Sequence, residues 1–72
     1  MEQPLEFQLQ GQPFVELDAL LKLTGLCDTG GLAKVAIAGG LVTIDGEVEL
    51  RRRRKVRAGQ TVSFEGRAIA VR

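Results

Sequence analysis

Hydrophobic and polar side chains alternate at the start of the chain. In residues 5–10 every second position is apolar, and this period of two predicts a β-strand. Gly11 and Pro13 follow, and both residue types favour turns over strands, so we expect the strand to end there. A strand this short is expected at the edge of a sheet.

The apolar spacing then changes to about 3.6 residues, which predicts a helix over residues 17–24. Asp18 and Lys22 stand four residues apart on its polar side and are expected to pair. Gly25 follows directly and predicts the end of the helix.

A second helix is predicted from about residue 30 to residue 38. Asp28 or Thr29 can serve as its N-cap, and Gly39-Gly40 ends it. The pattern predicts that Leu32, Val35 and Ala36 face the core and that Lys34 faces solvent.

After the helices the period returns to two, and two β-hairpins are predicted. Asp45-Gly46 is a pair that tolerates the positive φ of a type I′ turn, and Glu65-Gly66 occupies the same place in the second hairpin. The flanking strands are expected at residues 41–44, 47–50, 61–64 and 67–71.

The composition is that of one folded domain, and the predicted helices and hairpins assign that domain to the α+β class. The chain has 72 residues, of which 44% are hydrophobic and 26% charged, and this balance is typical of a folded chain near the lower size limit for a single core. We therefore expect one domain over residues 1–72. The single cysteine, Cys27, and the absence of histidine predict a reducing compartment and neither a metal site nor a cofactor.

Residues 1–4 lack the basic flank and apolar stretch of a secretion signal. No apolar run approaches the ~20 residues that a membrane span needs, and no basic amphipathic helix with large apolar residues is predicted. We therefore expect a cytoplasmic monomer that does not bind membranes.

Charge is distributed unevenly along the chain. The net charge is +1, yet residues 1–50 hold eight acidic and two basic side chains, a balance of −6, whereas residues 51–72 hold eight basic and one acidic, a balance of +7. Six cations occupy the seven positions 51–57. A dense positive patch attracts polyanions, so this asymmetry predicts an acidic partner.

The cationic run at residues 51–57 is either a solvated loop or an anion-binding surface. Val56 is apolar, and Gly59-Gln60 predicts a tight turn, so we expect the run to be held against the protein. Anchored guanidinium groups bind phosphate oxygens bidentately with less loss of entropy, which favours phosphate binding. The expected contacts are Arg51, Arg52, Arg53, Arg54, Lys55 and Arg57, with Lys22 and Lys34 extending the patch across the helices.

Thr29, Gly30 and Gly31 open the second predicted helix. They form either a flexible turn or a place where an anion approaches bare backbone amides at the positive end of the helix. We include all three among the candidate contacts. Their spacing differs from that of a nucleotide-hydrolase phosphate loop, so ATP binding is not expected.

No catalytic constellation is predicted. The chain has no histidine, Cys27 is expected in the core, and most carboxylates lie beside turns or at helix starts, so no nucleophile stands with a base. Tyr and Trp are absent, and the three phenylalanines lie in apolar contexts, so no stacking platform for single-stranded bases is expected. We predict no enzymatic activity.

The chain resembles the RNA-binding domain named after ribosomal protein S-four, also called the αL RNA-binding motif, and above all its short stand-alone bacterial members. The resemblance covers about residues 14–64. It is carried by LDALLKLTGL, TGGLAK, the hairpin segment GLVTIDGEV and the basic segment KVRAG. It implies two short helices packed on a small, curved, mostly antiparallel sheet, with a helical face and nearby basic residues that meet structured RNA.

Two positions depart from the family's pattern. Many members begin the first helix with Arg-x-Asp, where this chain has Glu16-Leu17-Asp18, and many begin the second with Ser-Arg, where it has Thr29-Gly30. Two usual RNA-facing cations are therefore missing. We expect the four arginines to shift the contact surface toward residues 51–57.

We therefore predict a non-catalytic bacterial module that binds structured RNA, either ribosomal or transfer RNA, in association with the ribosome or its proteins. The alternative is a protein-interaction module whose basic face docks on an acidic protein partner.

Overall fold

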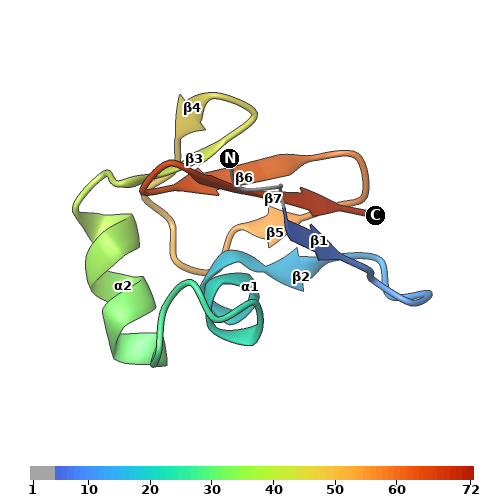
Figure 1. The fold of residues 1–72 in the computed structure, drawn as a ribbon, viewed down its shortest axis with the longest axis horizontal. Helices are drawn as coiled ribbons and strands as arrows, with labels where there is room; N and C mark the ends of the chain where they lie inside the picture. Colours follow the sequence, from blue (N-terminus) through green and yellow to red (C-terminus); the bar gives the residue numbers. More distant parts are fainter. Residues whose placement is uncertain (1–4) are drawn as a thin grey trace.

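The computed structural model describes residues 5–72 and places a sheet on one side of the molecule and two helices on the other (Figure 1). Residues 1–4, on which the expectation about a secretion signal depends, lie outside the described part. The main sheet has the order β1-β7-β6-β3-β4. Its strands are β1 (Leu5–Phe7), β3 (Val42–Ile44), β4 (Glu47–Val48), β6 (Thr61–Phe64) and β7 (Arg67–Val71).

The sheet is mostly antiparallel, as expected for this α+β class. Only β1 runs parallel to its neighbour, β7, and it lies at the edge of the sheet. Three of the strands are shorter than predicted: β1 ends at Phe7, β3 begins at Val42 and β4 ends at Val48. A second, two-stranded antiparallel sheet pairs β2 (Val15–Glu16) with β5 (Lys55–Val56).

Both predicted helices are present. Helix α1 (Leu17–Leu23) is followed by its C-cap Thr24 and then by Gly25, whose φ is +82°. Helix α2 (Gly30–Ala38) begins after Thr29, whose hydroxyl accepts a hydrogen bond of 3.1 Å from the Leu32 N–H. Of the two N-cap candidates, Thr29 is therefore the cap. In the described residues neither helix has the length and apolarity needed to cross a membrane.

The predicted turn between β3 and β4 is confirmed. Asp45 has φ +52° and Gly46 has φ +86°, which are the two positive values that a type I′ turn requires. The Asp45 carboxylate also accepts a hydrogen bond of 2.9 Å from the Thr61 N–H, so the turn is tied to the start of β6.

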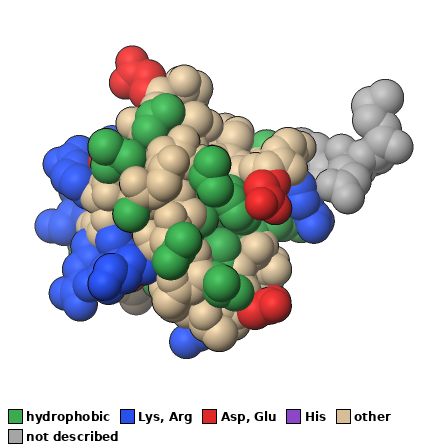
Figure 2. Space-filling model, turned by 90° about the vertical axis from the view of Figure 1, so that its left-hand side faces the viewer, with side chains coloured by type: hydrophobic (Ala, Val, Ile, Leu, Met, Phe, Trp, Pro, Cys, Tyr) green, Lys and Arg blue, Asp and Glu red, His purple; other side chains and the backbone are tan. Residues whose placement is uncertain are grey.

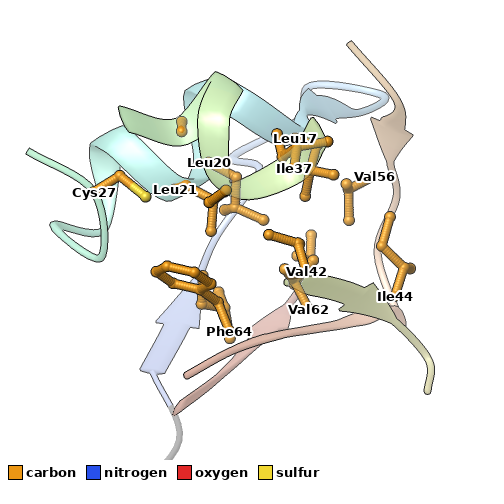
Figure 3. Packing of buried hydrophobic residues seen from close by; sticks show 14 of the residues in the cluster. Leu17, Leu20, Leu21, Cys27, Ile37, Val42, Ile44, Val56, Val62 and Phe64 are labelled. Atoms are coloured by element: carbon orange, nitrogen blue, oxygen red, sulfur yellow. The ribbon is translucent and has the colours of Figure 1, made fainter. Parts of the chain in front are cut away.

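The hydrophobic core lies between the helices and the sheet (Figure 3). Leu17, Leu20 and Leu21 from α1 are completely buried, as are Val42 and Val62 from the sheet. Burial of each such side chain contributes about 1.5–3 kcal/mol to folding. These residues occupy the apolar positions of the helix pattern and of the strand pattern. Their packing holds both helices against one face of the sheet.

The inward face predicted for α2 is partly wrong. Ala36 is buried as predicted, but Leu32 is 52% exposed and Val35 is 68% exposed, whereas Ala33 and Ile37 are completely buried. The helix is apolar on nearly all sides, so its sequence contains two apolar stripes with the same spacing. One consists of residues 32, 35 and 36, and the other of residues 33, 36 and 37. The stripe that includes two alanines faces inward, because small side chains let the helix pack closely. Ile37 is buried beside them, and Leu32 and Val35 are left at the surface.

Candidate nucleic-acid interface

The cationic run is fixed to the protein through its backbone. Val56 is completely buried, and the carbonyls of Arg54 and Arg52 accept hydrogen bonds of 2.9 and 3.0 Å from the N–H groups of Leu17 and Asp18. These N–H groups belong to the first turn of α1, which has no side-chain cap. The run therefore satisfies helix donors that would otherwise lack partners, and the prediction that it is anchored is confirmed.

Most of the predicted cations surround one shallow concavity of about 430 Å³. Lys and Arg side chains gather on one side of the face shown in Figure 2. The concavity is lined by Arg51, Arg53, Arg54, Lys55 and Arg57, and we call it the basic concavity. Five positive charges around one hollow raise the local electrostatic potential and attract anions.

Glu49 organises two of these arginines. Its Oε2 lies 3.1 Å from Arg51 Nε, and its Oε1 lies 3.1 Å from Arg54 Nε. The Glu49 side chain is only 14% exposed. The side-chain hydrogen bond from Arg51, with further help from its backbone N–H and the nearby charges, lowers the pKa of Glu49 to about 2, and the same contact raises the pKa of Arg51.

Arg52 points away from the basic concavity toward α1. Its Nε lies 3.7 Å from Asp18 Oδ2, so Asp18 pairs with Arg52, and the predicted pairing with Lys22 is wrong. Arg52 can reach Asp18, although the two are far apart in sequence, because the backbone of the cationic run lies against the first turn of α1.

A second concavity, of about 260 Å³, adjoins the first. Arg53 lines both, so the two form one continuous surface. The remaining lining residues are Glu16, Asp18, Ala19, Lys22 and Gly30. The structure thus places Lys22 and Gly30 around the same hollow as Arg53, together with two carboxylates.

An aromatic ring supports the other end of the run. Lys55 Nζ lies 4.9 Å and Arg57 Cζ lies 5.8 Å from the centre of the Phe14 ring, both within the range of a cation–π interaction. The Arg57 guanidinium also reaches the Pro13 carbonyl at 3.4 Å. Four of the six cations in the run are therefore held either by Glu49 or by Phe14, and Arg52 is held by Asp18.

Arg53 differs from its neighbours. Within residues 5–72 its side chain makes no ion pair and no hydrogen bond. It lies where the two concavities meet. Its guanidinium is therefore fully available to a ligand.

The remaining candidates are less central. Thr29 uses its hydroxyl to cap α2, and Lys34 is exposed on α2 but lines neither concavity. A Cβ placed on Gly30 would meet no atom within 4 Å, and one placed on Gly31 would meet only the Thr29 hydroxyl, at 3.7 Å. The backbone at the start of α2 is thus open, but no positive φ requires glycine at either position.

Sequence reasoning missed Glu49, Asp18 and Phe14 as parts of the site. Glu49 stands two residues before the arginines, and this proximity was the one available signal. Asp18 and Phe14 are far from the run in sequence and meet it only through the pairing of β2 with β5 and the docking on α1.

Among residues 5–72 there is no group of three or more His, Cys, Asp or Glu side chains that could hold a metal ion. Burial raises the pKa of the Cys27 thiol, which keeps it protonated. What the surface can do chemically is bind anions.

Comparisons with known proteins agree on one family. A family model described as the S4 domain matches residues 7–72. The Escherichia coli K12 protein named "Putative RNA-binding protein YbcJ" is 54% identical over 65 residues, which are 90% of this chain and 93% of that protein. The Shigella flexneri protein named "Uncharacterized protein YbcJ" matches with the same identity and coverage.

The fold is shared with a solved relative. The solution structure of YbcJ from E. coli, described as revealing an αL motif involved in RNA binding, is similar with a TM-score of 0.75 and 51% sequence identity. The similarity covers 99% of this chain and 90% of that one.

Proposed function

This chain belongs to the S4 domain family, and we propose from this premise that it binds RNA, without catalysing a reaction, through the basic concavity. The observation that carries the proposal is the arrangement of Arg51, Arg53, Arg54, Lys55 and Arg57 around one hollow. Their backbone is anchored by the buried Val56, so little chain entropy is lost when phosphates bind.

The substrate class that fits this surface is structured RNA. A-form helices are recognised through their shape and phosphate backbone, and a fixed row of guanidinium groups suits a fixed row of phosphates. Stacking of unpaired bases needs open aromatic rings, whereas the Phe14 ring is already covered by Lys55 and Arg57. We therefore favour hairpins or junctions over unstructured strands.

The contacts we assign include the neighbouring helices. Arg53 is the leading phosphate contact because no carboxylate holds it, and Lys22 and Gly30 extend the surface from the second concavity. We place Arg52, Thr29, Gly31 and Lys34 at its margin. Residues 1–72 act as a single domain in this proposal, and one copy carries the whole surface.

The named relatives come from bacteria. We propose ribosomal or transfer RNA as the partner, in the cytoplasm and in association with the ribosome, since these are the abundant structured RNAs of a bacterial cell. The surface offers no base-reading aromatic that would indicate a particular sequence.

Anisotropy titration of a labelled RNA hairpin and an unstructured poly-U strand of equal length tests the proposal. We expect the hairpin to bind more tightly at every salt concentration. Equal binding, or a preference for poly-U, would contradict recognition of structured RNA.

Absorbance gives an independent check on purified protein. The chain contains no Trp or Tyr and absorbs little at 280 nm, so RNA that co-purifies at low salt dominates the spectrum. A high-salt wash of the same sample is the control. If neither this sample nor the hairpin titration shows RNA binding, the alternative of an acidic protein partner takes its place.

A further inference from the structure

An apolar strip lies on the surface beside the basic concavity. Among residues 5–72, six large hydrophobic side chains are more than half exposed. Leu23 is on α1, and the other five belong to α2 and to the segment that follows it. These five are Leu32, Val35, Leu41, Val48 and Leu50, and we call them the apolar strip.

The strip is continuous. Leu32, Val35 and Leu41 line a groove of about 280 Å³ together with the edges of Leu26 and Phe64. Beyond this groove the chain passes through Gly40, where an added Cβ would lie 3.8 Å from Val48 Cγ1 and 4.0 Å from Leu50 Cδ2. The bare glycine backbone therefore joins the groove to the last two residues of the strip.

The two ends of the strip carry opposite charges. Asp28 and Glu65 line the groove, whereas Leu50 is followed directly by Arg51, the first residue of the basic concavity. Figure 2 shows this face: hydrophobic side chains occupy its middle, most Lys and Arg side chains gather to the left of them, acidic side chains lie to the right, and a further acidic side chain lies at the upper left.

The chemistry of the strip fits protein better than RNA. Its side chains are all aliphatic, and RNA bases are held by aromatic or guanidinium planes and by hydrogen bonds. A contiguous exposed apolar patch with a charged rim is typical of a protein–protein interface.

We propose that the apolar strip is the contact surface for a second copy of this chain. A two-fold axis that lies in the interface and crosses the strip at right angles places the acidic end of each copy against the basic end of the other. The face is thus complementary to itself, as an isologous dimer requires. This replaces the expectation of a monomer that we drew from the sequence.

The interface would cover a modest share of the molecule. A specific interface buries about 800 Å² per partner, which is about one sixth of the total accessible surface of 4722 Å². Five aliphatic anchors without an aromatic residue give a modest affinity, since hot spots are mainly Trp, Tyr and Arg. We expect a dimer that dissociates in the micromolar range.

Sedimentation velocity of the protein without RNA, from about 5 to about 500 μM, tests the proposal over the concentrations at which a weak dimer forms and dissociates. The parent should shift from monomer to dimer, and Val35→Lys should remain a monomer throughout. Leu23→Lys is the matched control, because Leu23 is 66% exposed and Val35 is 68% exposed, and it should dimerise like the parent. Thermal melts establish that each variant is folded.

Charge reversal tests the orientation of the two copies. Asp28→Lys and Arg51→Glu should each abolish the dimer, because each creates like charges across the axis, and an equimolar mixture should recover it, because opposite charges then meet at both contacts. A parent that stays monomeric at the highest concentration, equal effects of Val35→Lys and Leu23→Lys, or no recovery in the mixture would overturn the proposal. None of these results bears on RNA binding by the single chain.

Discussion

Glu49 accepts three hydrogen bonds from Arg51, at 3.0 Å from the backbone N–H, 3.1 Å from Nε and 3.2 Å from Nη2. The same carboxylate lies 3.1 Å from Arg54 Nε. It therefore fixes the first turn of the cationic run and holds two guanidinium groups in place, while it cancels one of the charges that a polyanion would meet. The basic concavity is thus preorganised by an acidic residue.

Replacement of Glu49 by Gln should reduce the pH dependence of stability. The folded state lowers the pKa of Glu49 to about 2, from an unfolded value of about 4.3. A carboxyl with a lowered pKa stabilises the fold while it is ionised, so this stabilisation is present above about pH 5 and is lost as the pH falls toward 2. The free energy of unfolding should therefore fall less in Glu49→Gln than in the parent over this interval.

Urea unfolding at several pH values measures this difference. Glu47→Gln is the control, since Glu47 is an exposed acidic residue two positions before Glu49 and makes no ion pair within residues 5–72. It should retain the parent's pH dependence. Identical curves for Glu49→Gln and the parent would mean that the ion pair contributes nothing to folding.

Arg53→Ser should weaken RNA binding more than any other single change in the run. Loss of one charge-assisted contact of about 1.5 kcal/mol lowers affinity roughly tenfold. The slope of log affinity against log salt should also become shallower by about 0.7–0.9. Stability should stay at the parent's value, because Arg53 has no protein partner within residues 5–72.

The control for Arg53 is Arg72→Ser, which removes the same charge from the end of the chain. Arg72 directly follows β7, and its Nε lies 3.6 Å from Oε1 of Glu6 in β1. Anisotropy titrations at matched salt should show a small effect for Arg72→Ser. Equal losses for the two variants would show that net charge, and not the concavity, governs binding.

Phe14→Leu should lower RNA affinity without unfolding the protein. Each cation–π contact contributes about 0.5–1 kcal/mol at an exposed site, and the ring orders both Lys55 and Arg57. Loss of that order should weaken binding roughly three- to tenfold, while leucine keeps most of the apolar contact. Tighter binding by Phe14→Leu would mean that the ring competes with the RNA for these cations.

The fold was largely predictable because its periodicities are local. The two hairpin turns, the ends of both helices and an N-cap at Asp28 or Thr29 depend on residues within a few positions of one another. The structure confirms them, with Thr29 as the cap. The face of α2 was not predictable in the same way, because Val35 and Ile37 are both apolar and only packing against α1 and the sheet decides which of them is buried.

The site was predictable in part for a similar reason. The arginines are adjacent in sequence, and their gathering needs no tertiary information. Which arginine lacks an acidic partner depends on contacts between residues far apart in sequence. Asp18 reaches Arg52 only because the carbonyls of residues 52 and 54 accept hydrogen bonds from the start of α1. The sequence therefore predicts a basic surface, and the structure distinguishes Arg53 within it.

Gly46→Ala should destabilise the fold and leave the RNA-binding surface unchanged. Gly46 has φ +86° in the turn between β3 and β4, and an alanine forced into this region costs about 1 kcal/mol or more. That is a substantial fraction of the stability of so small a domain. Gly30→Ala is the matched control, because Gly30 does not have a positive φ and an added Cβ there would meet no atom within 4 Å.

Thermal melts should therefore separate the two glycine variants, with a lower midpoint for Gly46→Ala and an equal or higher midpoint for Gly30→Ala, since alanine at a helical position without strain reduces the entropy of the unfolded chain. RNA titration at a temperature well below both melting midpoints then measures the effect of each substitution on RNA affinity, separately from its effect on stability. Gly46→Ala should bind like the parent, because the turn lies outside both concavities. Gly30→Ala should bind more weakly if RNA phosphates approach the backbone at the start of α2, and unchanged binding would remove Gly30 from the proposed surface while leaving the arginines in it.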